Sequence, residues 1–87
     1  MRSLILIPLL FTASAAVAGP ICTSEPSSKW LTEAAMKERI VASGHKIDVF
    51  KVTKGNCYEI YGRNPEGKRV EIYYHPISGD TVKISTR

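Results

Sequence analysis

The chain has 87 residues, with 12 Lys or Arg against 8 Asp or Glu and a net charge of +4. A chain of this length forms one domain with a modest core. Its positive residues alternate with Glu and Asp and do not form the basic stripe with aromatic platforms that nucleic-acid binding requires, so we expect no nucleic-acid partner.

The first 18 residues have the pattern of a secretory signal peptide. Arg2 is the basic tip, residues 4–11 are apolar, and small residues end at Ala18. The apolar run is shorter than the roughly 20 residues that span a bilayer, which makes a retained anchor the weaker alternative. A lipoprotein would need a cysteine directly after the small residues. We therefore expect cleavage after Ala18, a periplasmic or secreted protein, and no stable membrane anchor.

Residues 19–28 are rich in Pro, Ser and Thr and are predicted to form an extended leader to a domain in residues 29–87. The two cysteines, Cys22 and Cys57, both follow the cleavage site. In an oxidising compartment an even pair favours a disulfide. A loop of about 35 residues closed in this way contributes about 3–4 kcal/mol, comparable with the net stability of so small a domain.

Zinc binding is the alternative for the two cysteines, because His45 and His75 would complete a set of four ligands. The sequence has neither C-x-x-C nor H-x-x-x-H spacing, and a thiol redox function would also need C-x-x-C. We therefore predict no metal site and no cofactor.

One amphipathic helix is predicted after the leader. Thr32 is a suitable N-cap, Glu33 lies in the first turn, and Gly44 suits the end of the helix. Met36 and Ile40 share one face. A helix of about three turns is unstable alone in water, so it must pack on another element.

Four strands follow, at residues 45–53, 57–62, 68–75 and 81–85, separated by turn sequences such as that of residues 64–67. The adjacent apolar residues Val49 and Phe50 break the alternation and indicate a bulge or a change of face. We expect an α+β fold in which the helix packs on a four-stranded antiparallel meander. The predicted core is Trp30, Leu31, Met36, Ile40, Ile47, Phe50, Val52, Tyr58, Ile60, Val70, Ile72, Val82 and Ile84.

Strand parity places Cys57 on the face opposite to Tyr58 and Ile60, together with Glu59 and Tyr61. A bridge to Cys22 therefore requires the leader to reach the second strand from the sheet edge or from the outer face.

These residues resemble the PepSY domain, in the small exported form found in Gram-negative bacteria. The resemblance covers nearly all of the mature chain. It rests on Cys22 and Trp30 before the helix, Gly44-His45, Cys57-Tyr58-Glu59-Ile60-Tyr61, Gly67-Lys68-Arg69-Val70-Glu71 and His75-Pro76-Ile77-Ser78-Gly79. It implies a helix on an antiparallel sheet and a non-catalytic module, as in the propeptides of secreted thermolysin-like proteases. His45, His75 and Ser78 depart from the family pattern, and no shared function is assigned to the two histidines.

The candidate binding face is the outer face of the sheet. Parity places Tyr61 and Tyr73 there, beside Glu59 and Glu71. Exposed tyrosines provide rigid contact area, and paired carboxylates can bind a cation or act in acid–base chemistry. The structural alternative is that tyrosines simply favour strands and that the glutamates are solvated polar positions.

No catalytic residues are predicted. Ser78, His75 and Asp80 are close in sequence but belong to a tight turn. We expect a monomeric binding module that inhibits or regulates an exported protease or binds an envelope protein. The last strand is a second candidate surface, as a sheet edge that accepts a partner strand. The alternative function is small-ligand or metal binding on the outer face.

Overall fold

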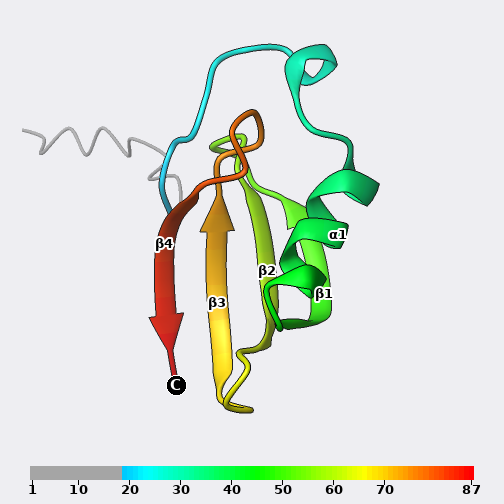
Figure 1. The fold of residues 1–87 in the computed structure, drawn as a ribbon. Coiled ribbons are helices and arrows are strands. Elements are labelled where there is room, and N and C mark those ends of the chain that lie inside the picture. Colours follow the sequence, from blue (N-terminus) through cyan, green and yellow to red (C-terminus); the bar gives the residue numbers. More distant parts are fainter. Residues whose placement is uncertain (1–18) are drawn as a thin grey trace, which may run out of the picture.

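The computed structural model describes residues 19–87; the predicted signal peptide, residues 1–18, lies outside the described residues. The elements are a 3-10 helix η1 (Ser27–Lys29), helix α1 (Glu33–Ala42) and strands β1 (Lys46–Val52), β2 (Tyr58–Arg63), β3 (Arg69–Tyr74) and β4 (Thr81–Thr86). The strands form one antiparallel sheet in the order β1-β2-β3-β4 (Figure 1). The predicted α+β architecture is confirmed. Within residues 19–87 no helix combines the length and apolar character needed to cross a bilayer.

Helix α1 begins and ends where its sequence predicts. The side chain of Thr32 accepts a hydrogen bond from the backbone N–H of Ala35 at 3.1 Å, which satisfies one of the free donors of the first turn. Gly44 follows the helix with φ +88°, the left-handed conformation that glycine adopts most easily. The helix buries Met36 and Ile40 against the sheet.

The core lies under α1 and is narrower than predicted. Its buried members come from α1 and from the two central strands: Met36, Ile40, Tyr58, Ile60, Val70, Ile72 and Tyr74. Trp30, Leu31, Ile47 and Phe50 are only partly buried at its margin. The predictions for Val52, Val82 and Ile84 were wrong, since these side chains are 45%, 44% and 54% exposed. They lie on the edge strands β1 and β4, and a single helix of this length cannot cover all four strands.

Both edge strands contain a register shift. Between the pairs Ile47–Gly62 and Val49–Tyr61, β1 carries Asp48 as an extra residue. This confirms the predicted irregularity and explains how Ile47 and Phe50, which are three residues apart, both pack against the core. A second shift, between Tyr73 and Tyr74 of β3, leaves Val82 as an extra residue in β4.

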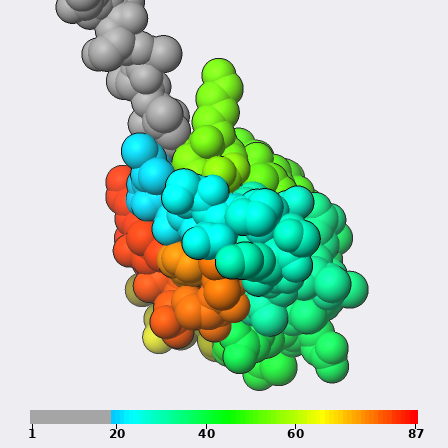
Figure 2. Space-filling view, turned by 90° about the horizontal axis from the view of Figure 1, so that it is seen from above, coloured from blue at the N-terminus to red at the C-terminus, as the bar shows by residue number. Residues whose placement is uncertain are grey.

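The leader crosses the end of the sheet and is bonded to it. The predicted disulfide joins Cys22 to Cys57. The backbone N–H of Cys22 also donates to the carbonyl of Gly55 at 2.8 Å. Figure 2 shows the leader beside the turn between β3 and β4. Beyond Cys22 toward the N-terminus the chain reaches Tyr73 on the outer face, which is one of the two routes that parity allowed.

Candidate functional site

The four candidate residues of the outer face are direct neighbours in the sheet. Glu59 of β2 pairs with Tyr73 of β3, and Tyr61 pairs with Glu71. Lys51 of β1 lies beyond Glu59 in the first of these rows. The strand register therefore brings the predicted residues together on the face turned away from α1.

The alternation of the strands suggests that all four side chains are exposed to solvent, but their exposed fractions differ widely. Tyr61 is 37% exposed and Glu71 is half-buried, whereas Glu59 is 2% and Tyr73 is 7% exposed. The leader lies over part of this face: a Cβ atom on Gly19 would be 2.9 Å from the hydroxyl oxygen of Tyr73. Tyr61 and Glu71 are thus the accessible members of the predicted set.

One ion pair links the buried carboxylate of Glu59 to strand β1. The Oε1 atom of Glu59 lies 3.4 Å from Nζ of Lys51. The pKa of Lys51 is raised, first by its hydrogen bond to Glu59 and then by the charge of that group. The same ammonium lies 5.1 Å from the ring centre of Tyr61. Among the described residues, Oε2 of Glu59 has no hydrogen-bond partner.

The hydroxyl of Tyr73 is protonated and directed at a carboxylate. It donates to Oε1 of Glu71 at 2.9 Å. Burial raises the pKa of Tyr73 well above its usual range, and the hydrogen bond to Glu71 and the negative charges of Glu59 and Glu71 raise it further. We define the Glu59 hollow as the surrounding depression of about 360 Å³, which is lined by Lys51, Val52, Thr53, Lys54, Glu59, Tyr61 and Tyr73.

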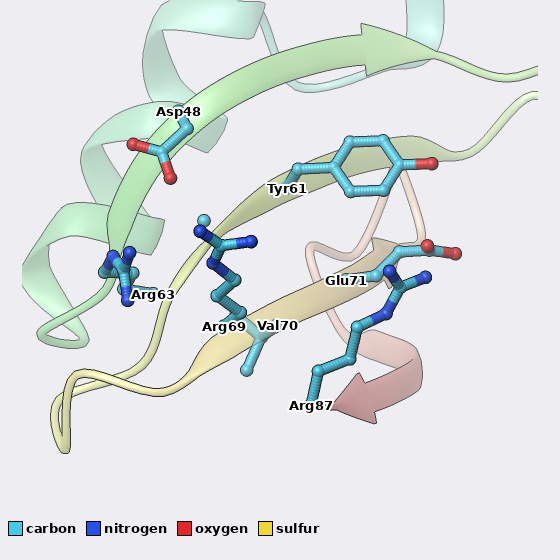
Figure 3. Close-up of a pocket in the computed structure, with 8 residues that line it drawn as sticks. Asp48, Tyr61, Arg63, Arg69, Val70, Glu71 and Arg87 are labelled. Atoms are coloured by element: carbon cyan, nitrogen blue, oxygen red, sulfur yellow. The ribbon is translucent and has the colours of Figure 1, made fainter.

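Three arginines form a second feature of the outer face that sequence reasoning missed. Arg63 and Arg69 are directly opposed in β2 and β3, and the backbone N–H of Arg87 donates to the carbonyl of Arg69 at 2.8 Å. We define the arginine hollow as the depression of about 250 Å³ lined by Asp48, Tyr61, Gly62, Arg63, Arg69, Val70, Glu71 and Arg87 (Figure 3). None of the three guanidinium groups makes an ion pair with a carboxylate of the described chain. The position of Arg63 and Arg69 on either side of the turn at 64–67 was the signal available in the sequence.

The polar residues of the turn between β3 and β4 serve the turn itself. Nδ1 of His75 accepts from the backbone N–H of Ile77 at 3.2 Å, and Oγ of Ser78 accepts from that of Asp80 at 3.2 Å. The Ser78 hydroxyl is therefore engaged within the turn. No group of three His, Cys, Asp or Glu side chains suited to a metal ion occurs within the described residues.

The β4 edge is the third candidate surface. In the described chain β4 pairs with β3 alone, so its other edge is free of any strand. Helix α1 contacts β1, at the far edge of the sheet (Figure 1). Between α1 and β4 lies a groove of about 230 Å³ whose apolar lining is Met36, Ile40, Ile72, Tyr74 and Ile84. The side chain of Ile84, which is 54% exposed, thus forms part of an apolar surface beside an unpaired strand edge.

Comparison of the amino-acid sequence with family models gives a match. A family model described as peptidase propeptide and YPEB domain matches residues 3–85, which is nearly the whole chain. A comparison with curated proteins and one with solved structures found no match.

Proposed function

Because this chain belongs to the family of peptidase propeptide and YPEB domains, we propose that it is a non-catalytic binding module that acts outside the cytoplasm on an exported protease or an envelope protein. The disulfide between Cys22 and Cys57 is compatible with export, since such bonds persist in oxidising compartments. The predicted signal peptide at residues 1–18 points to the same destination.

The observation that carries this proposal is the β4 edge. An unpaired strand exposes a row of backbone N–H and C=O groups, and an extended segment of a partner satisfies them by adding a fifth strand. Alternate side chains of that segment would lie over the groove beside Ile84 and Met36. Lys83 on this strand and Arg87 directly after it are charges that discourage indiscriminate pairing between copies.

Affinity capture from envelope extract tests this assignment. We expect the wild-type protein to recover a protein partner and Ile84→Asp to lose it, because a carboxylate at the groove cannot be buried against an apolar partner strand. Val41→Asp is the matched control: Val41 is 59% exposed on α1, so the same change there should leave recovery unaltered.

Two outcomes would count against the proposal. One is that the wild-type protein recovers no partner under any growth condition. The other is that Ile84→Asp and Val41→Asp recover the partner equally well, which would move the binding surface away from β4.

A second candidate function is binding of a small anionic ligand, and the arginine hollow favours it. Arg63, Arg69 and Arg87 place three permanent positive charges around one depression, next to the accessible ring of Tyr61, and the guanidinium of Arg63 also donates to the carbonyl of Gly67 at 2.9 Å. Guanidinium groups bind carboxylates and phosphates with paired N–H donors. The outer face would then be the ligand site and β4 an ordinary edge strand.

A further inference from the structure

The backbone of Gly19 lies directly on the buried tyrosine of the outer face. A Cβ atom at this position would be 2.8 Å from Cε1 and 2.9 Å from the hydroxyl oxygen of Tyr73. Gly19 also has φ +94°, in the left-handed region. Both the close approach and the backbone conformation thus require a residue without a side chain.

The position of Gly19 is held by bonds a few residues away. Cys22 is joined to Cys57, and the side-chain amide of Asn56 donates to the carbonyl of Thr23 at 3.1 Å. Gly19 is three residues from the disulfide, so at most about 11 Å of chain separates it from a fixed point. The start of the leader therefore cannot move far from Tyr73.

Two carboxylates lie around the hydroxyl that Gly19 contacts. Tyr73 donates to Glu71, and Glu59 is the direct cross-strand neighbour of Tyr73. Lys51 pairs with Oε1 of Glu59, while Oε2 is buried with no hydrogen-bond partner among the described residues. A buried carboxylate oxygen without a donor is costly, so the folded chain gains from any cation that reaches it.

We propose that Glu59 and Glu71 form a binding site for the α-ammonium group that cleavage after Ala18 would create at Gly19. In the uncleaved chain the nitrogen of Gly19 belongs to a neutral peptide with a single donor. In the cleaved chain it has a positive charge and three donors. Only the cleaved chain can therefore make charged hydrogen bonds to these carboxylates, and signal removal would tighten the packing of the leader on the outer face.

Other charged groups face the same hollow and set the strength of this interaction. Lys51 of β1 and Lys54 of the following turn line it, and Lys83 of β4 is paired with Tyr73. Of these three, only Lys51 makes an ion pair with the carboxylates. The carboxylates favour the charged amine and the lysines oppose it. Where the carboxylates outweigh the lysines, the charged amine stabilises the folded chain. This stabilisation is present below about pH 8 and is lost as pH rises through the pKa of the bound amine.

The test uses the full chain exported with its own signal, and intact mass identifies the first residue. One glycine inserted between Ala18 and Gly19 moves the amine by one residue. We expect the insertion to raise the equilibrium constant for urea unfolding roughly three- to tenfold, and to have a clearly smaller effect in Glu59→Gln, in which only Glu71 remains. Glu66→Gln removes an exposed turn carboxylate as a control and should leave the insertion effect intact.

A second measurement keeps the test decisive if Glu59→Gln does not fold. In an NMR titration the α-amino group of the exported protein should titrate above its usual range of about 7.7–8.0 and return toward it in Glu71→Gln. The proposal is overturned by a mature chain that does not begin at Gly19, by an equal insertion effect in Glu59→Gln, or by an amine that titrates in the usual range.

Discussion

Tyr74 shows how burial of one hydroxyl links the stability of this protein to alkaline pH. Its side chain is 6% exposed in the core, and burial raises its pKa to about 12. A tyrosine in an unfolded chain has a pKa of about 10. The folded state therefore binds the phenolic proton more tightly. The resulting stabilisation is complete below about pH 10 and is lost as pH rises toward 12.

We predict that the free energy of unfolding in urea falls between pH 10 and pH 12, and that Tyr74→Phe makes this fall shallower. Tyr58 and Tyr73, whose pKa values are raised mainly by burial, supply the remaining dependence. Tyr61→Phe is the matched control, because it makes the same change at an exposed tyrosine. Equal slopes in Tyr74→Phe and the wild-type protein would contradict the prediction.

At the scale of elements, the pairing of β2 with β3 contains a repulsive contact. Arg63 and Arg69 are direct cross-strand partners, and like charges in that position destabilise an antiparallel pair. The main chain of Arg87 bonds to the same end of β3 and brings a third guanidinium group to the arginine hollow. An anion bound there would relieve the repulsion, which is the physical reason for the second candidate function.

We predict that phosphate raises the melting temperature of the wild-type protein by a few degrees over chloride of equal ionic strength. Arg69→Gln should reduce this response to the level of chloride, because it removes one of the opposed charges. Lys68→Gln is the control, since it removes an exposed positive charge from the adjacent turn. A phosphate response of equal size in both variants would reflect the general stabilising effect of phosphate on folded proteins and exclude a site in the hollow.

At the scale of the whole molecule, the disulfide holds the leader to the sheet. It joins Cys22, ahead of η1 and α1, to Cys57, directly before β2, across a sequence separation of 35 residues. The covalent bond reduces the conformational freedom of the unfolded chain. It also keeps the leader over Tyr73, so that a side chain far from the helix is buried without belonging to the main core.

We predict that replacing both Cys22 and Cys57 by Ser lowers the free energy of unfolding by about 3–4 kcal/mol. Denaturant unfolding measures the loss, and the wild-type protein in reductant should approach the same value. Intact mass after alkylation, with and without reductant, establishes the pairing in the exported protein. Two free thiols in that protein, or a double serine variant as stable as the wild type, would contradict the prediction.

Local patterns were sufficient for the elements and their order. Thr32 and Gly44 bound the helix by capping chemistry, the turn sequences separate the strands, and the parity of Cys57 with Glu59 correctly restricted how the leader could arrive. Such features depend on a few neighbouring residues, so they can be inferred from the chain alone.

The burial of a side chain depends on which segments pack over its face of the sheet, and local sequence patterns were insufficient to predict it. Alternation predicts the same exposure for Glu59, Tyr73 and Tyr61, yet the first two side chains are buried. It also predicts the same burial for Ile84 and Ile72, yet Ile84 is exposed because α1 does not cover it. The arginine hollow likewise needs a register that joins residues from β2, β3 and the end of the chain. The amino-acid sequence determined which segments are helix and strand, because that choice is local. Only the tertiary structure decided which side chains solvent or a partner can reach, because accessibility depends on distant segments that pack over them.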